Sequence, residues 1–221
     1  MKAMILAAGL GSRMSPLTDV IPKPLLEVGG KALIVWHIEK LVSQGFREIV
    51  INVAHLGYKI IDALGDGSKW GVNIVYSDEQ EEGALESAGG IIKALPLLGD
   101  ETFLVLNADI FTSYDFNADF RLAEGILAHL ILVPNPVHNT QGDFALNDHL
   151  VIDEQAYTFA GIGYYHPTLF SATSYGKHSL VPLLREAMKK GQVSGVYYDD
   201  GIWLDIGTPK RLEDLNANLV G

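Results

Sequence analysis

The stretch that decides the fold lies close to the N-terminus and reads Met4-Ile5-Leu6-Ala7-Ala8-Gly9-Leu10-Gly11-Ser12-Arg13-Met14. Its apolar first half predicts a short buried strand that ends at Gly9. Gly9 and Gly11 allow the backbone to approach an anion closely and to point N–H groups at it. Arg13 adds a planar cation that can pair with two phosphate oxygens. The stretch therefore predicts the first strand of a sheet, followed by a phosphate-binding turn.

A second basic residue follows this turn, because Lys23 stands between Pro22 and Pro24. The prolines restrict the backbone on both sides, so the lysine stem starts from a stiff base. No run in the chain has the Walker spacing of Gly, four residues and Gly-Lys-Ser/Thr. The dinucleotide fingerprint also fails, since Met14 stands where its third glycine is needed. The glycines alone would fit an ordinary turn, but together with the two cations they favour a triphosphate site.

Length, charge and composition exclude several classes of protein. The chain has 221 residues, a size expected for one domain, and its formal net charge of −11 argues against a nucleic-acid partner. No uninterrupted apolar run reaches the ~18 residues of a membrane helix, and the short apolar stretch after Lys2 does not resemble a signal peptide. The absence of cysteine excludes disulfides and thiolate metal sites. We therefore expect a cytoplasmic protein with no membrane partner, either a monomer or a small homo-oligomer.

Strands and helices alternate through the first half of the chain. Strands are expected at 4–8, 48–53, 72–76 and 102–107, and helices at 32–44, 56–64 and 87–95, the last of them ending before Pro96. This alternation predicts an α/β fold with a doubly wound, mostly parallel sheet. Ligands of such sheets bind at the carboxyl ends of the strands, where the glycine turn, Asn107 and Asp109 all lie. The sequence therefore predicts that these groups share one site.

The regular alternation of predicted strands and helices ends after residue 125. We expect strands at 126–133, 144–146, 151–152, 157–165, 193–198 and 202–206, a helix at 179–190, and a last helix from Pro209 to the chain end. Thr208 precedes this proline and is expected to cap the last helix. We interpret 1–221 as one domain with a core at 1–125 and a second part at 126–221. Within the second part, 126–165 is expected to form a β extension and lid.

Two acidic residues are candidates for a metal site. Asp109 follows the apolar strand at 102–107, and Asp205 lies in the apolar run Ile202-Trp203-Leu204-Asp205-Ile206. A carboxylate in such surroundings is costly unless it is paired, hydrogen-bonded or bound to a metal. Mg²⁺ is often held by one or two carboxylates together with substrate phosphates. The residues alone leave other interpretations open: an Asx-turn at Asp109, and a salt bridge or a helix cap at Asp205.

The seven histidines show no metal-binding spacing on one helix face. His37 and His129 are most simply packed within the fold, whereas His55 and His138 stand where they could touch a substrate. The sequence offers no convincing pair of a histidine and a carboxylate for general acid–base catalysis.

At the turn and at the two acids the chain resembles a known family. Ala7 to Met14, followed by Pro22-Lys23-Pro24-Leu25, is similar to the two-part signature of the sugar-1-phosphate nucleotidyltransferases. The resemblance implies a Rossmann-like domain that joins a nucleoside triphosphate to a sugar 1-phosphate and releases pyrophosphate. It also implies a Mg²⁺ cofactor, since Asn107-Ala108-Asp109 and Trp203-Leu204-Asp205-Ile206-Gly207-Thr208 resemble the family's two metal-ligand motifs. Ala108 stands where glycine is more usual.

The resemblance implies roles for single residues. Arg13, Lys23 and Asp109 are expected to be catalytic: Arg13 holds the leaving phosphates, and Lys23 holds the sugar phosphate and the charge that develops at the α-phosphorus. Asp109 and Asp205 are expected to hold the metal. The residues expected to bind the nucleotide are Leu6, Ala7, Ala8, Gly9, Gly11, Ser12, Arg13, Ser87 and Asn107, together with Glu81 or Glu79 at the base. Spacing favours Glu81, and a longer loop would favour Glu79.

The segment Leu85-Glu86-Ser87-Ala88-Gly89-Gly90 resembles one subgroup of that family. This subgroup consists of uridylyltransferases that act on N-acetylmuramic acid 1-phosphate in peptidoglycan recycling, which implies that UTP and this sugar phosphate are the substrates. The part at 126–221 would then bind the sugar, with Gly142 and Gly161 close to it and Glu154 at a hydroxyl group. The alternatives are mannose or heptose guanylyl transfer, glucose thymidylyl transfer, or a nucleotide-sugar sensor without catalysis.

Overall fold

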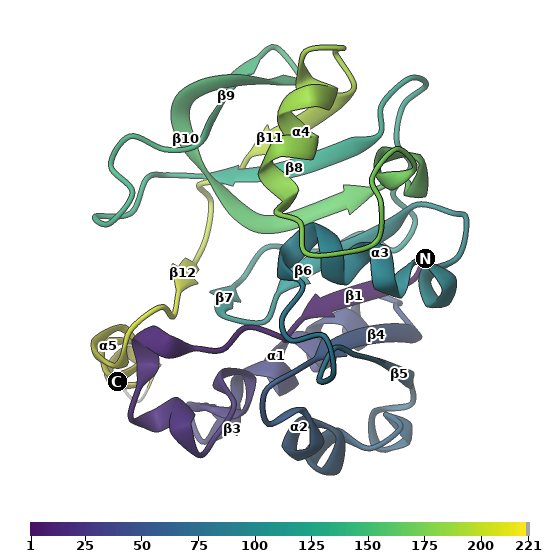
Figure 1. Cartoon of the computed structure of the whole chain (residues 1–221). Helices are drawn as coiled ribbons and strands as arrows, with labels where there is room; N and C mark the ends of the chain where they lie inside the picture. The colour runs from purple at the N-terminus through teal and green to yellow at the C-terminus, as the bar shows by residue number, and fades with distance from the viewer. Residues whose placement is uncertain (220–221) are drawn as a thin grey trace.

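One eight-stranded sheet forms the centre of the protein, whose computed structural model describes residues 1–219. The strand order is β11-β8-β10-β6-β1-β4-β5, with β9 paired to β10 (Figure 1). Four neighbouring strands are parallel: β1 (Ala3–Leu6), β4 (Glu48–Val53), β5 (Asn73–Asp78) and β6 (Phe103–Asn107). Because β1 pairs with β4 on one side and with β6 on the other, the strand order reverses between β1 and β6. The predicted doubly wound α/β fold is confirmed.

Helices cover both faces of this parallel part. α1 (Leu33–Ser43) and α2 (Gly57–Leu64) pack against one face, and α3 (Glu86–Leu98) packs against the other. The alternation of side chains along a strand produces the two layers, since Ile5 belongs to the first core and Met4 to the second. Both faces of the sheet are buried, which is why its strands are apolar at nearly every position.

Helix α3 is longer than the sequence predicts. Pro96 was expected to lie past its end, but the helix continues through Pro96 to Leu98. A proline so close to the C-terminus of a helix removes one backbone hydrogen bond without interrupting a following turn. Leu98 is buried against the sheet and keeps the last turn packed.

The second half of the chain extends the same sheet. β8 (Ala128–Val133), β10 (Leu150–Tyr165) and β11 (Val193–Tyr197) lie beyond β6, and β9 (Phe144–Asn147) pairs with β10. Since β10 runs antiparallel to both β6 and β8, this end of the sheet is mixed. Helix α4 (Leu180–Met188) shares a buried apolar cluster with α3 and covers the same face.

Strand β10 joins two stretches that the sequence predicts as separate strands, at 151–152 and 157–165. Its pairing shifts register between Ile152 and Tyr157, and again between Phe159 and Gly163. The exposed residues 153–155 lie in the first irregularity and interrupt the apolar pattern. An irregular ladder of this kind bends a strand without ending it, so the pattern alone divides one strand into two.

Several short elements complete the fold. Single 3₁₀ turns are η1 (Ser12–Met14), η2 (Leu17–Asp19), η3 (Lys23–Leu25), η4 (Ser68–Trp70) and η5 (Pro167–Phe170). β2 (Glu27–Val28) pairs with β3 (Lys31–Ala32) in a small hairpin. α5 (Pro209–Leu219) packs beside this N-terminal region through a third apolar cluster (Figure 1).

The last helix begins at Pro209 as predicted, and the final part of that prediction, 220–221, lies outside the described residues. β7 (Ile110–Thr112) pairs antiparallel with β12 (Trp203–Asp205), which leads into α5. Within residues 1–219, none of the helices combines the length and the apolar character that a membrane span requires.

Candidate active site

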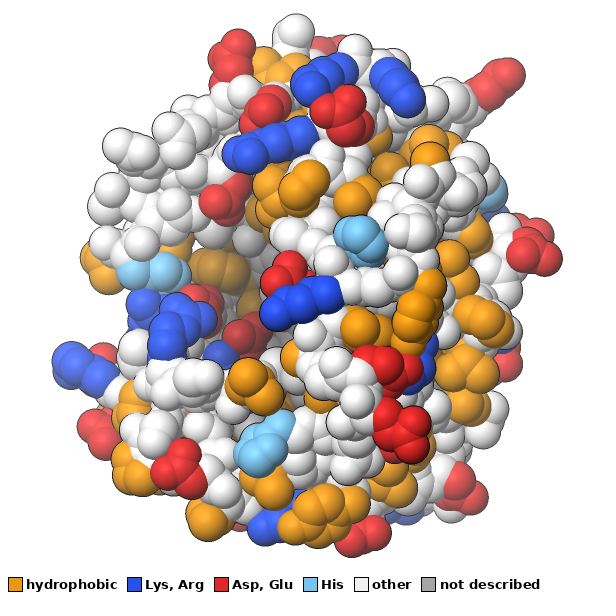
Figure 2. Space-filling view, viewed as in Figure 1, with side chains coloured by type: hydrophobic (Ala, Val, Ile, Leu, Met, Phe, Trp, Pro, Cys, Tyr) orange, Lys and Arg blue, Asp and Glu red, His pale blue; other side chains and the backbone are white. Residues whose placement is uncertain are grey.

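Two cavities open at the carboxyl ends of the central strands. The first has a volume of about 510 Å³ and lies over the ends of β1 and β6, which contribute Leu6 and Asn107. The second, of about 350 Å³, shares Arg13, Asn107 and Asp109 with the first. Figure 2 shows the molecule hollowed in this region, with charged side chains at the rim. The shared residues join the two cavities into one candidate site at the switch point of the sheet.

Most residues predicted for the nucleotide line the first cavity, and these are Leu6, Ala7, Ala8, Gly9, Gly11, Ser12, Arg13, Ser87 and Asn107. The turn after β1 is tight, since the Met14 N–H donates to the Gly11 carbonyl at 2.7 Å. Gly11 has a φ of +65°, and a Cβ at this position would lie 2.9 Å from Cγ2 of Thr18. Glycine is therefore required at position 11 by both the backbone conformation and the available space.

Lys23 and Asp109 form a close ion pair beside this turn. Nζ of Lys23 lies 2.6 Å from Oδ2 of Asp109, and the lysine side chain is only 10% exposed. Lys23 begins the turn η3, and Asp109 follows the end of β6. A cation that is mostly buried needs such a partner, because an unpaired charge away from water is costly. The predicted phosphate-binding lysine thus lies directly against one of the predicted metal ligands.

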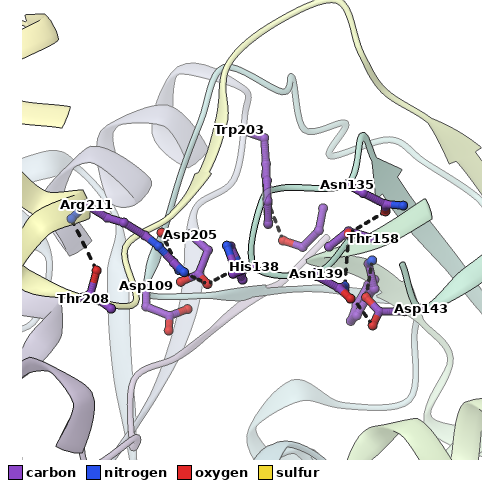
Figure 3. Close-up of polar contacts among 12 residues, drawn as sticks. Asp109, Asn135, His138, Asn139, Asp143, Thr158, Trp203, Asp205, Thr208 and Arg211 are labelled. Carbon is purple, nitrogen blue, oxygen red and sulfur yellow. Dashed lines mark hydrogen bonds and ion pairs between the residues drawn. The ribbon is translucent and has the colours of Figure 1, made fainter. Parts of the chain in front are cut away.

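Asp205 comes to the same place from the far end of the chain. The pairing of β12 with β7 sets Asp205 opposite Ile110, and the Ile206 N–H donates to the Asp109 carbonyl at 2.9 Å. Asp109 and Asp205 both line the second cavity, and Figure 3 shows their side chains close together. A short two-stranded ladder therefore brings together two acids that are distant in sequence.

The two carboxylate oxygens of Asp205 have different surroundings. Oδ2 accepts a hydrogen bond from Nη1 of Arg211 at 2.9 Å, and Nε2 of His138 lies 3.1 Å away from it. Oδ1 is buried and has no hydrogen-bond partner among the described residues. The salt bridge that the sequence left open is thus present at one oxygen only. A buried polar atom without a partner costs about 1–3 kcal/mol, so Oδ1 marks a place where a ligand is expected.

The donor set fits a hard divalent cation. Asp109 and Asp205 both line the second cavity, and carboxylate oxygens are ligands that Mg²⁺ prefers. Residues 1–219 contain no cluster of three or more His, Cys, Asp or Glu side chains that could hold a metal. An ion bound by these two acids would therefore take further oxygens from phosphates or water, as Mg²⁺ commonly does.

The two glutamates predicted for the base lie outside the linings of both cavities. Glu79 is fully buried, and its carboxylate accepts hydrogen bonds from Nδ2 of Asn52 at 2.7 Å and from the Leu85 N–H at 2.8 Å. Burial raises the pKa of the Glu79 carboxyl group. Glu81 is exposed to solvent. Glu79 therefore holds neighbouring groups in place, and neither carboxylate lies on the cavity wall.

Asn52 is a cavity residue that the sequence analysis did not identify. It lies in β4 and lines the first cavity, and its Oδ1 accepts a hydrogen bond from the Ala7 N–H at 2.8 Å. Asn52 thus connects the buried Glu79 with the phosphate turn. The available signal was a polar residue within an otherwise apolar strand, which needs partners when it is buried. The other residues of this cavity that the site prediction does not include are Leu10, Met14, Pro24, Ala84, Glu86, Ala108 and Gly207.

Of the three residues predicted for the sugar, Gly161 alone lines the second cavity. Its φ is +71°, and a Cβ there would lie 2.5 Å from Nδ2 of Asn107, so no side chain fits. Gly142 lies away from the cavity, where a Cβ would meet Asn135 and the Tyr157 backbone. Glu154 is exposed on β10 and also lines neither cavity.

The loop after β8 supplies His138 and Asn139 to the second cavity, and β10 supplies Thr158. Nδ2 of Asn139 donates to Oδ1 of Asp143 at 3.1 Å and to Oγ1 of Thr158 at 3.2 Å. Oγ1 of Thr158 donates in turn to Oδ1 of Asn135 at 2.8 Å (Figure 3). These bonds tie the loop to the edge of β10 and hold its side chains at the cavity.

The chain is similar to known proteins over nearly its whole length. Residues 2–142 match the nucleotidyl transferase family. The chain is 53% identical to the N-acetylmuramate alpha-1-phosphate uridylyltransferase of Neisseria meningitidis serogroup B, over 98% of this chain and 97% of the relative. It is 34% identical to the protein of the same name from Caulobacter vibrioides, over 98% of this chain and 96% of the relative. Among solved structures, a Bacillus anthracis protein assigned as a glucose-1-phosphate thymidylyltransferase has a TM-score of 0.87 at 24% identity, over 99% of this chain and 94% of that chain, which shows a shared fold.

Proposed function

The chain belongs to the nucleotidyl transferase family, and from this premise we propose that it transfers the uridylyl group of UTP to N-acetylmuramic acid 1-phosphate. The products are UDP-N-acetylmuramic acid and pyrophosphate. The observation that carries the proposal is the 53% identity, across almost both full lengths, with the N-acetylmuramate alpha-1-phosphate uridylyltransferase of Neisseria meningitidis. In this role the protein returns a cell-wall sugar to a nucleotide-activated form.

We assign the first cavity to UTP. The backbone N–H groups of the turn at 9–12 suit a triphosphate, and Arg13 can pair with the two phosphates that leave. The uracil is proposed to lie toward Asn52, Ala84 and Ser87, which also line this cavity. Glu79 serves this side indirectly, because it holds both Asn52 and the Leu85 backbone.

The chemistry needs positioning and charge neutralisation. An oxygen of the sugar phosphate attacks the α-phosphorus of UTP, and a new P–O bond forms as the bond from the α-phosphorus to the bridging oxygen breaks. Pyrophosphate leaves with the electron pair of that bond. No side chain has to remove a proton, since the attacking phosphate is already ionised at neutral pH. Lys23 is proposed to stabilise the negative charge at the α-phosphorus.

Asp109 and Asp205 are the residues that would hold Mg²⁺. When it is bound, the ion supplies positive charge that lets two anionic phosphate groups approach each other. Asp109 also holds the Lys23 ammonium group through Oδ2. Asp205 contributes a buried oxygen that has no hydrogen-bond partner within residues 1–219, and this observation favours an ion at this position.

The second cavity suits the sugar phosphate. Its lining includes Arg13 and the two acids, which we assign to the phosphate, and Gly161 and Asn139, which we assign to the sugar. The absence of a side chain at Gly161 allows a sugar ring to approach the backbone closely. Gly142 is proposed to act through the shape of the loop that carries Asn139, and no contact is proposed for Glu154.

A screen of pyrophosphate release tests the proposal. UTP, dTTP, GTP, CTP and ATP are each combined with N-acetylmuramic acid 1-phosphate, N-acetylglucosamine 1-phosphate, glucose 1-phosphate and mannose 1-phosphate. We expect turnover with UTP and N-acetylmuramic acid 1-phosphate to exceed every other pair. Turnover only with GTP and mannose 1-phosphate, or only with dTTP and glucose 1-phosphate, would overturn the proposed substrates. Tight nucleotide binding without turnover for any pair would instead support a sensor.

A further inference from the structure

Arg211 and His138 both contact the same oxygen of Asp205. Nη1 of Arg211 lies 2.9 Å from Oδ2, and it also lies 3.5 Å from the Asp205 backbone carbonyl. Nε2 of His138 lies 3.1 Å from Oδ2. The side chains of Arg211 and Asp205 are only 27% and 18% exposed, so water weakens this pair less than it would on an open surface. With Oδ2 held by these contacts, Oδ1 is buried and has no hydrogen-bond partner in the described part of the chain, residues 1–219.

Helix α5 holds Arg211 in a fixed position. Arg211 lies in the first turn of α5, where its backbone N–H donates to Oγ1 of Thr208 at 3.4 Å. Leu212, the next residue, packs in the apolar cluster between α5 and the N-terminal region. Nδ2 of Asn216 donates to the Glu27 carbonyl at 3.1 Å and ties the helix to β2. The guanidinium group therefore starts from a backbone that is anchored beside the phosphate turn.

Gly207 leaves the space that the contact between Arg211 and Asp205 needs. Its φ is not positive, so the backbone conformation does not require glycine. A Cβ at position 207 would lie 2.9 Å from Nη1 of Arg211 and 3.0 Å and 3.2 Å from the two carboxylate oxygens of Asp205. These separations are shorter than an ordinary van der Waals contact of ~3.5–4.0 Å. Glycine at this position is explained by the room that the ion pair takes.

We propose that Arg211 is a positioning residue for the metal ligand Asp205, and that Gly207 is needed to let it act. By holding Oδ2, Arg211 directs Oδ1 alone at the metal. The proposal deepens the proposed function and rests on its assignment of Asp205 as a metal ligand. Groups that orient a ligand in this way typically change metal affinity or activity by about 10–100-fold when they are removed. His138 adds a contact from the loop of the second cavity, so that Asp205 is held from both sides.

Binding of Mn²⁺, followed by its electron paramagnetic resonance signal, tests the proposal without turnover. The protein is saturated with a UTP analogue that carries a methylene group between the α- and β-phosphorus atoms, and Mn²⁺ is then titrated. Arg211→Met is expected to weaken Mn²⁺ binding by about 10-fold or more. Arg211→Lys keeps the positive charge but not the planar guanidinium group, and it is expected to weaken Mn²⁺ binding by less. Gly207→Ala, in which all charges remain, is expected to weaken it in the same direction as Arg211→Met.

Lys210→Met is the matched control. Lys210 is the preceding residue of α5, and it pairs with Asp214 at 3.2 Å on the exposed surface. Removing its charge is expected to leave the Mn²⁺ titration unchanged. Thermal unfolding of each variant, measured without metal, separates a loosened helix from a misdirected carboxylate. A role of Arg211 in fastening α5 alone would lower the melting temperature and leave Mn²⁺ binding as in the wild type.

The outcomes distinguish the positioning role from the metal assignment. If Arg211→Met and Gly207→Ala bind Mn²⁺ like the wild type, or if Lys210→Met weakens binding equally, the role of Arg211 is overturned while Asp205 can still be a ligand. If Arg211→Met does not fold, Gly207→Ala and Arg211→Lys decide the question. A wild-type protein that binds no Mn²⁺ with the nucleotide would overturn both the positioning role and the metal site. Mn²⁺ binding without uridylyl transfer would contradict the proposed reaction only.

Discussion

Replacement of Asn52 by leucine is expected to break the connection between the buried Glu79 and the phosphate turn. Asn52→Leu removes the acceptor of the Ala7 N–H and the donor to Oε1 of Glu79, which lie at 2.8 Å and 2.7 Å. Leucine is similar in size, so the loss is one of hydrogen bonds and not of volume. Each buried polar group left without a partner costs about 1–3 kcal/mol, and a charged group lies at the upper end of that range. The expected loss is about 3–5 kcal/mol of unfolding free energy, a large part of the total for a domain.

Urea unfolding measures this loss, and the KM for UTP measures its effect on the site. Because Ala7 lines the first cavity, which we assign to UTP, we expect the KM to rise by about 10-fold, equivalent to about 1.4 kcal/mol. Asn73→Leu is the control, since Asn73 is exposed on the neighbouring strand β5 and its replacement should stay within about 0.5 kcal/mol of the wild type. If Asn52→Leu were as stable as Asn73→Leu and bound UTP like the wild type, the reasoning about this network would be refuted.

Three further changes have defined outcomes. Asp109→Asn is expected to reduce uridylyl transfer by about 10³-fold in a pyrophosphate-release assay, because it removes the ionic partner of Lys23 and a charge that we propose holds the metal. Activity within tenfold of the wild type would contradict this. Gly161→Ala is expected to raise the KM for the sugar phosphate more than the KM for UTP. It is also expected to lower the free energy of unfolding by about 1–3 kcal/mol, because of the positive φ and the contact of the new Cβ with Asn107. Equal changes in both KM values would count against a sugar site at Gly161. Burial lowers the pKa of His129 to about 4, so the unfolded chain takes up a proton below pH 6.5 that the folded protein does not, and stability is lost as the pH falls from about 6.5 to 4. At pH 5 this residue lowers the free energy of unfolding by about 2 kcal/mol. In urea unfolding, the free energy of unfolding of His129→Phe should therefore decrease less between pH 7 and pH 5 than that of the wild type. An equal decrease in both proteins would contradict the lowered pKa of His129.

The strands and helices of the parallel half of the fold can be predicted because each is specified by its own stretch of sequence. The apolar run of β4 and the helix that follows it can be recognised without knowing their neighbours, and alternation then implies the sheet. Strand β10 could not be predicted as one element, since its irregular pairing near residues 153–155 depends on partners in β8 and β9. The predicted end of α3 before Pro96 was wrong for a related reason. The packing of Leu98 on the sheet outweighs the local tendency of proline to end a helix.

The site likewise contains residues that the sequence predicts and contacts that it does not. The glycine turn, Lys23 and the two acids are motif residues, and their residue types already indicate phosphates and a metal. The contacts among His138, Asp205 and Arg211 could not be foreseen, because they join three segments whose approach depends on the pairing of β7 with β12. Glu81 or Glu79 was predicted to contact the base, and the acidic loop that contains both gives no indication that the Glu79 carboxylate turns inward to Asn52.

The most direct test of the account is the position of a divalent cation relative to Asp109 and Asp205. Crystals of the protein with Mn²⁺ and the methylene analogue of UTP would locate the ion by its anomalous scattering. We predict one ion within ~2.1 Å of a carboxylate oxygen from each residue, with Oδ1 as the ligand from Asp205. An ion bound to the triphosphate but to neither carboxylate, with Oδ1 of Asp205 still lacking a partner, would contradict it.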